Sequence, residues 1–193
     1  GIDAWKSTNT IIEYSVSHSN GRGSHGNGNG VKAGGGGANN NTIVRNTIAF
    51  NNKSAGFTSN GGRNITFENN TSYNNRGAVF YGADSTTFRN NIGIGGSLQL
   101  NGGREERNSW NLGISNPGFA STDPSNPNFL ALASGSPAID AGANIDRPFS
   151  GSAPDLGALE YGVTIASLVD INGYYAASGA VFGTAEQLAA AGF

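Results

Sequence analysis

Phe67-Glu68-Asn69-Asn70-Thr71-Ser72-Tyr73 is the stretch that decides the fold, because its pattern recurs without gaps at three other places in the chain. The matching stretches are residues 12–18, 44–50 and 88–94. Successive repeats begin roughly 20 to 30 residues apart, and a period of this size fits one coil of a β-helix. We therefore predict an all-β chain whose short strands wind into a right-handed parallel β-helix, a solenoid of stacked coils.

Within each repeat, apolar residues lie two and four positions apart, which is the period of a strand. Stacking the coils gives two predicted inward columns, Ile12, Val44, Phe67 and Phe88 in the first and Val16, Ile48, Thr71 and Ile92 in the second. Between them falls a predicted asparagine ladder of Asn46, Asn69 and Asn90, with a second at Asn20, Asn52 and Asn75. Stacked amides bond to one another and to turn backbone, which satisfies polar groups that the turns would otherwise bury.

A further strand is predicted after each of these turns, and the opening Gly1-Ile2-Asp3-Ala4 fits the same place in its coil. The inward positions of these strands are Ile2, Val31, Phe57, Phe80 and Leu98. The next residue of each strand then points outward, and this outward row is Asp3, Lys32, Thr58, Tyr81 and Gln99. Neighbouring strands lie about 4.8 Å apart, so successive side chains of the row touch.

The repeats divide the chain into three predicted parts. Residues 1–101 form the coils, with a glycine- and asparagine-rich loop at residues 20–30 that bulges from one of them. Residues 102–161 are rich in turn-forming residues and are predicted to be irregular, packing on the solenoid or capping it. Residues 162–193 form an apolar tail, in which Thr184 is predicted to N-cap a short helix over 185–191.

The composition argues against several classes of protein. The formal net charge of −2 gives no reason to expect a nucleic-acid partner. Cysteine is absent, which excludes disulfides and thiol chemistry, and no apolar stretch approaches the roughly 20 residues that span a bilayer. The chain has no methionine and opens abruptly at Gly1, from which we expect a processed or truncated piece of a longer precursor.

Lys32 and Asp3 form the candidate site, because they are neighbours in the outward row. An exposed lysine–carboxylate pair is more often an ordinary surface contact worth under ~1 kcal/mol. Here, glycines on both sides of Lys32 leave room for a bulky ligand, and the loop at 20–30 lies beside it, which favours a binding role. The candidate substrate contacts are Thr58 and Tyr81 of the same row and His25 of the loop.

Several stretches resemble the family 9 polysaccharide lyases, which are calcium-dependent pectate lyases with a parallel β-helix fold. They are Gly28-Asn29-Gly30-Val31-Lys32-Ala33-Gly34-Gly35, Asn51-Asn52-Lys53-Ser54-Ala55-Gly56-Phe57 and Phe67-Glu68-Asn69-Asn70-Thr71-Ser72-Tyr73-Asn74-Asn75. The resemblance covers roughly residues 1–96. It implies that Lys32 is the catalytic base and that Asp3, which matches the end of the family's D-D-G-I-D motif, is a ligand of Ca²⁺.

The two aspartates that open that motif are absent from this chain. Since Ca²⁺ takes about six to eight oxygen ligands, Asp3 alone makes an incomplete site, and we expect the cofactor to be bound in a full-length parent. β-Elimination removes the proton beside the carboxylate of a galacturonate, and a cation on that carboxylate stabilises the developing charge. Lysine suits the base because arginine does not readily lose its proton.

Two functions follow from these observations. The first is a secreted lyase that cleaves pectate or polygalacturonate, present here in an N-terminally truncated form. The second is a non-catalytic extracellular β-helix that forms surface structures or filaments by head-to-tail self-association, with Val163-Thr164-Ile165 or Ala180-Val181-Phe182 as the docking segment. Export is expected in either case, because residues 136–142 and 155–161 resemble the ends of secreted bacterial β-helix proteins.

Overall fold

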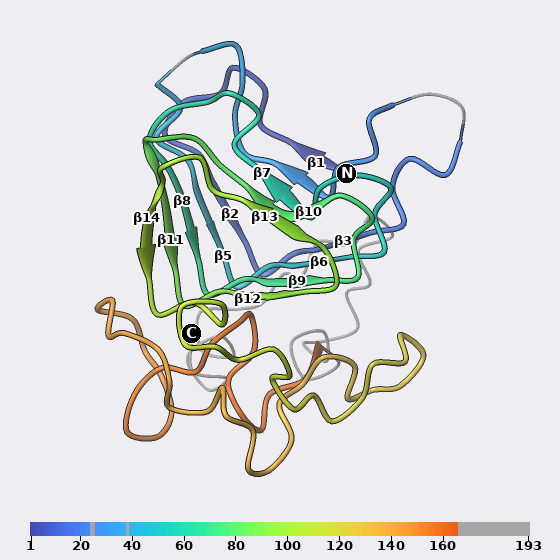
Figure 1. Cartoon of the computed structure of the whole chain (residues 1–193), viewed down its shortest axis with the longest axis vertical. Helices are drawn as coiled ribbons and strands as arrows, with labels where there is room; N and C mark the ends of the chain where they lie inside the picture. The colour runs from blue at the N-terminus through green and yellow to red at the C-terminus, as the bar shows by residue number, and fades with distance from the viewer. Residues whose placement is uncertain (24–25, 38, 166–193) are drawn as a thin grey trace, which may run out of the picture.

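The computed structural model describes residues 1–23, 26–37 and 39–165, and its strands form three parallel sheets (Figure 1). Sheet 1 contains β1 (Ile2–Asp3), β4 (Val31–Lys32), β7 (Phe57–Thr58), β10 (Ala78–Tyr81) and β13 (Ser97–Gln99). Sheet 2 contains β2 (Ile11–Glu13), β5 (Ile43–Arg45), β8 (Ile65–Glu68), β11 (Thr86–Arg89) and β14 (Arg104–Glu106). Sheet 3 contains β3 (Val16–His18), β6 (Ile48–Phe50), β9 (Thr71–Tyr73) and β12 (Ile92–Ile94). The prediction of a right-handed parallel β-helix is confirmed.

Sheets 1 and 2 bury the inward columns that the sequence predicts, except at β13, where the predicted inward residue Leu98 is 39% exposed. In sheet 2 the register places one residue of each coil over the next, in the order Ile12, Val44, Phe67 and Phe88. In sheet 1, Phe57 and Phe80 are fully buried and stack with their ring centroids 5.0 Å apart. Each buried aromatic side chain contributes roughly 1.5–3 kcal/mol of transfer free energy, so these two columns hold the coils together.

Sheet 3 departs from the prediction, because its second column points outward. The column Val16, Ile48, Thr71 and Ile92 faces away from the interior, whereas the small residues Ser17, Ala49, Ser72 and Gly93 face inward. The cause is the corner residue Asn69, whose φ of 48° is left-handed. Side chains alternate between the inner and outer faces only within a strand, and this corner shifts the alternation by one residue. The inward side chains are therefore Phe67, Asn70 and Ser72.

The asparagine ladders form, although the first is displaced by one position. Asn46, Asn69 and Asn90 share the left-handed corner, with φ values of 45°, 48° and 54°, and Asn90 Nδ2 donates to Asn69 Oδ1 at 3.3 Å. The continuous ladder is the buried set of the next position, Asn70, Asn91 and Asn108, joined by amide bonds of 3.1 and 2.9 Å. The second predicted ladder is confirmed, since Asn20 bonds Asn52 at 2.8 Å and Asn52 bonds Asn75 at 2.9 Å.

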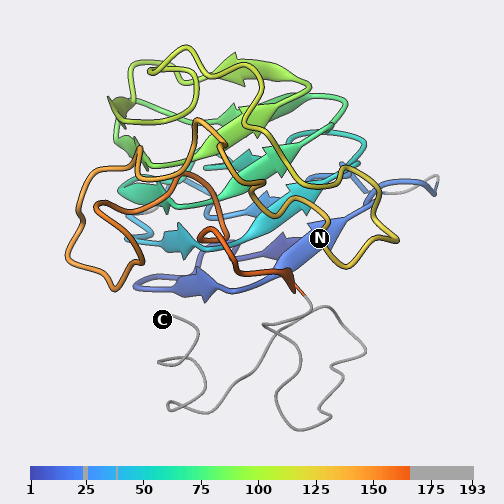
Figure 2. The same ribbon diagram turned by 90° about the horizontal axis from the view of Figure 1, so that it is seen from below.

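Residues 107–165 are mostly irregular and lie against the outer face of sheet 3 (Figures 1 and 2). Their apolar side chains cover the outward column of that sheet in two clusters. The contacts include Ile48 and Phe50 with Phe129 and Leu159, and Ile92 with Leu132, Ala138 and Leu156. His18 stacks on Phe50 with ring centroids 4.7 Å apart, at the aromatic position of its coil. The outward column of sheet 3 is thus buried by chain that follows the solenoid.

Val163 and Ile165 also pack on this surface, against the cluster that contains Ile48 and Phe50. Both side chains are partly buried by their own chain, so docking of 163–165 on a neighbouring molecule stays a prediction that these contacts do not support. The other candidate segment, 180–182, and the helix expected over 185–191 lie outside the described residues. Across the ranges that the structure describes, no helix has the length and apolar character needed to span a membrane.

Candidate functional site

The outward row of sheet 1 lies in the predicted order. The register pairs Asp3 with Lys32, Lys32 with Thr58, Thr58 with Tyr81, and Tyr81 with Gln99. Inward neighbours Val31, Phe57 and Phe80 anchor each strand in the core. The backbone that presents the row is therefore fixed by buried side chains one residue away.

Lys32 and Asp3 form a close ion pair. Lys32 Nζ lies 2.6 Å from Asp3 Oδ2, and the exposed fractions of the two side chains are 17% and 43%. Asp3 Oδ1 accepts a hydrogen bond from the backbone N–H of Trp5 at 3.0 Å, which orients the carboxylate toward the lysine. The pair thus presents a lysine whose side chain is largely covered, and whose amine contacts a carboxylate that is partly open to water.

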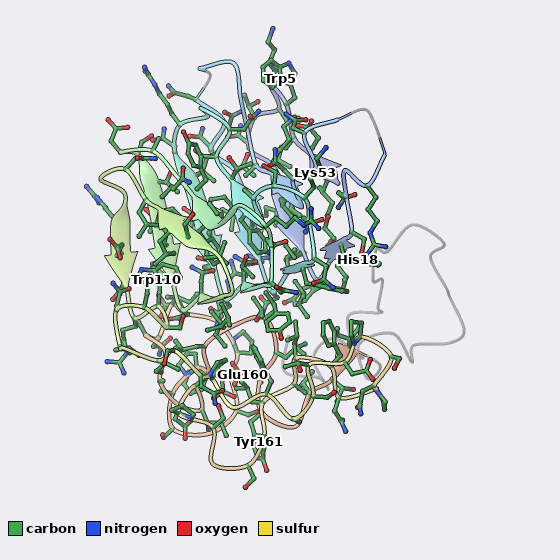
Figure 3. The ribbon with its side chains drawn as sticks, turned by 45° about the vertical axis from the view of Figure 1, so that its right-hand side comes forward. Trp5, His18, Lys53, Trp110, Glu160 and Tyr161 are labelled. Atoms are coloured by element: carbon green, nitrogen blue, oxygen red, sulfur yellow. The ribbon has the colours of Figure 1, made fainter. Side chains whose placement is uncertain are left out.

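Trp5 is a candidate site residue that the sequence reasoning missed. Its side chain is 52% exposed, and the centre of its ring lies 5.9 Å from Lys32 Nζ and 5.8 Å from Lys6 Nζ. Figure 3 shows it projecting outward from the coils, at the top of the view. Gly35 packs directly against the ring, where no side chain would fit. The sequence shows only that Trp5 stands two residues after Asp3, which does not reveal that its ring is exposed beside the site.

The other predicted contacts differ in how far a ligand can reach them. Tyr81 is 39% exposed and lies two strands from Lys32, about 10 Å along the row. Thr58 is buried between them, and its Oγ1 accepts a hydrogen bond from Asn60 N at 2.9 Å, so little of its side chain is open to a ligand. His25 lies outside the described residues.

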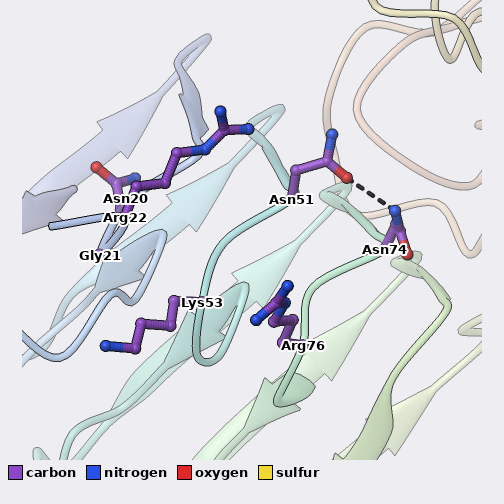
Figure 4. A pocket seen from close by; sticks show the side chains of 7 residues that line it. All are labelled: Asn20, Gly21, Arg22, Asn51, Lys53, Asn74 and Arg76. Atoms are coloured by element: carbon purple, nitrogen blue, oxygen red, sulfur yellow. Dashed lines mark hydrogen bonds between the residues drawn. The ribbon is translucent and has the colours of Figure 1, made fainter.

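Two hollows adjoin each other along one edge of sheet 1. The first, about 250 Å³, is lined by Asp3 and Lys32 together with glycine and asparagine residues of the 20–30 loop. The second, about 580 Å³, is lined by Asn20, Gly21, Arg22, Asn51, Lys53, Asn74 and Arg76 (Figure 4). Both hollows are lined by Asn20 and Gly21, so they are neighbours at the base of the loop. The cations of the second hollow were also missed in the sequence.

The residues around Asp3 do not by themselves fit a calcium ion. Asp3 supplies one carboxylate, and both of its oxygens already accept contacts from Lys32 and Trp5. Over residues 1–23, 26–37 and 39–165 there is no group of three or more histidine, cysteine, aspartate or glutamate side chains that could hold a metal. A cation that takes about six to eight oxygens would need ligands in addition to these residues.

Three acidic side chains, Asp140, Asp155 and Glu160, interact in residues 107–165, the C-terminal segment, where Figure 3 labels Glu160. Burial, together with the charge of Asp155, raises the pKa of Glu160 to about 7. Its oxygens accept hydrogen bonds from the backbone N–H groups of Asp155 and Ser150. Asp140 Oδ1 accepts from Ser152 N and Ala153 N, and these bonds lower its pKa. The carboxylates thus fold the segment on itself by satisfying turn backbone.

Comparison with known proteins finds similarity to pectate lyases in sequence and in fold. Pectate lyase L of Dickeya chrysanthemi is 35% identical over 159 residues, which cover 70% of this chain and 37% of that protein. Pectate lyase L of Dickeya dadantii (strain 3937) is 34% identical with the same coverage. The crystal structure of pectate lyase Pel9A matches with a TM-score of 0.76 and 33% identity over 83% of this chain and 48% of that one. No protein-family model matches the chain.

The chain therefore resembles the family 9 pectate lyases in both sequence and fold. It spans 37% of the length of the curated relatives that it matches.

Proposed function

We propose that this chain carries the base and part of the substrate groove of a secreted polysaccharide lyase that cleaves pectate by β-elimination. One observation supports this above all: Lys32, largely shielded from water, stands beside Asp3 in a hollow lined by glycine and asparagine, on a fold shared with Pel9A. A lysine buried only to satisfy a charge would not need an open hollow of about 250 Å³ in front of it.

In the proposed reaction, neutral Lys32 Nζ takes the C5 proton of a galacturonate unit. The electron pair of that C–H bond forms the C4=C5 double bond as the C4–O bond to the next sugar breaks. The departing oxygen takes a proton from water, and the lysine returns its proton to solvent. In the structure, Lys32 Nζ donates a hydrogen bond to Asp3 Oδ2. The nitrogen can therefore act as a base only after this contact opens and the proton is lost.

Asp3 is proposed to hold Lys32 in place and to contribute one carboxylate to a calcium site whose other ligands lie beyond the described residues. When bound, the cation would supply charge stabilisation for the substrate carboxylate. Calcium dependence, like secretion, is carried over from the resemblance to pectate lyases. The described residues do not by themselves assemble the coordination shell of the cation.

Exposed aromatic side chains near Lys32 are the proposed sugar contacts. Trp5 and Tyr81 each offer a face on which a pyranose ring can stack, at opposite sides of the lysine along the row. His25 is proposed as a further contact from the loop. Thr58 is proposed to act through its backbone position, as the spacer between Lys32 and Tyr81.

Lys32→Ala and Lys32→Arg test this assignment in the chain expressed with any sequence that flanks it in its gene. Release of unsaturated product from polygalacturonate is followed by ultraviolet absorbance with added calcium. Both variants should lose at least about 100-fold in kcat, because alanine removes the base and arginine keeps its proton. Arg104→Ala, an exposed cation on β14, is the control and should retain activity. Retention of more than about a tenth of the activity in Lys32→Ala would contradict the assignment.

The alternative function, a non-catalytic surface or filament protein, predicts no product even from the wild-type protein with calcium. It also relied on apolar tail segments free to dock on another copy. Val163 and Ile165 are instead packed on their own chain, so this segment gives the alternative no support.

A further inference from the structure

We propose that Arg22, Lys53 and Arg76 form a second subsite, which binds the carboxylates of uronate units next to the unit held at Lys32. This inference rests on the proposed function, because it assumes an acidic polysaccharide substrate. It adds a location and a binding role for three cations that the elimination chemistry does not use.

The three cations lie on one corner of the solenoid, between sheets 3 and 1. The ladder Asn20, Asn52 and Asn75 fixes this corner in three successive coils. Lys53 and Arg76 directly follow their ladder asparagines, and the coils are joined there by Lys53 N to Asn20 O at 3.1 Å and Arg76 N to Asn52 O at 3.0 Å. Adjacent coils are about 4.8 Å apart, so the two side chains rise from one row along the solenoid axis.

The loop beside this corner supports the stem of Lys53. Gly21 and Gly28, with φ values of 79° and 70°, pass so close to Lys53 that a Cβ on Gly28 would lie 2.7 Å from Lys53 Cβ. Ser54 N also donates to Gly28 O at 3.0 Å. Arg22 projects from the loop, and its guanidinium donates to Ser19 Oγ at 3.0 Å. A larger residue at Gly28 would collide with Lys53, so glycine lets the loop pack against the Lys53 side chain, which lines the hollow.

The charge of this hollow is uncompensated. Its seven lining residues include three cations and no carboxylate. Ion pairs within the described part of the chain join Lys32 to Asp3, Arg45 to Glu13, and two arginines to Glu68, and none involves the three cations. All three side chains are exposed, on a chain whose formal net charge is −2. Because the protein as a whole is slightly acidic, anionic ligands would be attracted here by the local positive potential of these three cations and not by the net charge.

A linear polyuronate suits this shape better than a single small anion. Figure 4 shows the cations spread along the hollow, with Asn51 and Asn74 joined by a hydrogen bond beside them. The asparagine amides offer both donors and acceptors, which match sugar hydroxyls. Lys53 and Arg76 arise from adjacent coils about 4.8 Å apart, so one extended polyanion can contact both cations. The row lies beside the Lys32 hollow, because Asn20 and Gly21 line both hollows.

The test measures binding of galacturonate oligomers by isothermal titration calorimetry, alongside turnover. Lys53→Gln/Arg76→Gln should weaken binding at least about tenfold, with little effect on methyl-esterified oligomers, and raised salt should narrow the difference. Arg63→Gln/Arg104→Gln removes two exposed arginine charges elsewhere and is the matched control. Unfolding curves for both double variants verify that the fold is retained.

The outcomes separate the two proposals. Normal turnover with equal affinity in both double variants would overturn the subsite and leave the lyase intact. Oligomer binding that depends on Lys53 and Arg76, without turnover by the wild-type protein expressed with any flanking sequence from its gene and supplied with calcium, would support the subsite while refuting the lyase. Absence of oligomer binding by the wild-type protein, or equally tight binding of single-stranded DNA of the same charge, would overturn the assignment to uronates.

Discussion

Replacing Glu160 with glutamine should reduce the loss of folding stability that the wild type shows as the pH rises. In the unfolded chain this carboxyl group ionises near pH 4.5, whereas in the folded protein its pKa is raised to about 7, mainly by burial. Between these values the unfolded state has lost a proton that the folded state keeps. The stability that the protonated carboxyl provides is therefore complete below pH 4.5 and is lost as the pH rises through about 7.

The size of the effect follows from the shift. One pKa unit corresponds to about 1.4 kcal/mol, which gives an upper bound of about 3 kcal/mol. Glu160 is only partly buried, so solvent screening reduces this to roughly 1 to 2 kcal/mol. Glutamine retains an acceptor for Asp155 N but loses the one for Ser150 N, worth about 0.5 kcal/mol. Glu160→Gln should therefore be more stable than the wild type by about 1 kcal/mol at pH 8.

Urea unfolding at pH 4.5, 6 and 8 measures this directly. The free energy of unfolding of the wild type should fall across that range, and the fall should be smaller in Glu160→Gln. Some fall remains, because burial also raises the pKa of Asp155. Glu106→Gln, an exposed carboxylate on β14, is the control and should behave like the wild type. An equal decline in Glu160→Gln and the wild type would refute the reasoning.

Two further predictions concern the ladders and the metal. Asn91→Ala removes bonds to Phe67 O and Asn108 Oδ1 and leaves the buried N–H of Asn70 unpaired, so it should lower the free energy of unfolding by about 3 kcal/mol in urea titrations. A loss below about 1 kcal/mol would mean that the ladder is dispensable. Titration of the chain with calcium chloride should give a Kd in the millimolar range or weaker, because Asp3 is its single carboxylate at the site, and a micromolar Kd would contradict the incomplete site.

The sequence predicts sheet 1 and sheet 2 well, because alternation within a strand determines which side chains face the core. Phe57 and Phe67 point inward as expected, and with them the order of Asp3 and Lys32 in the outward row. It fails at the corner between sheets 2 and 3. The left-handed residue at this corner interrupts the alternation of inward and outward side chains. Because both positions are asparagine, the sequence does not show that Asn69 forms the corner while Asn70 points inward.

The candidate site shows the same limit. Lys32 and Asp3 are found by register alone, since both lie on strands. Lys53 and Arg76 lie on corners, where side-chain direction depends on the turn and not on a period. Aligning the residue that follows each ladder asparagine in successive coils would have shown that the two cations stack. Trp5 requires knowledge of what surrounds it, because exposure beside a groove is a property of the folded chain.

The C-terminal segment also acts as a clasp across three coils. Its carbonyl oxygens at Ala143, Asp155 and Ala158 accept bonds from the corner amides of Asn90, Asn69 and Asn46, in the reverse of coil order. A solenoid without such a strap can fray one coil at a time. Here the three coils are tied to one late segment, so they should open together. During synthesis they remain unclasped, with the apolar outer face of sheet 3 exposed, until the ribosome has released the last of those carbonyls.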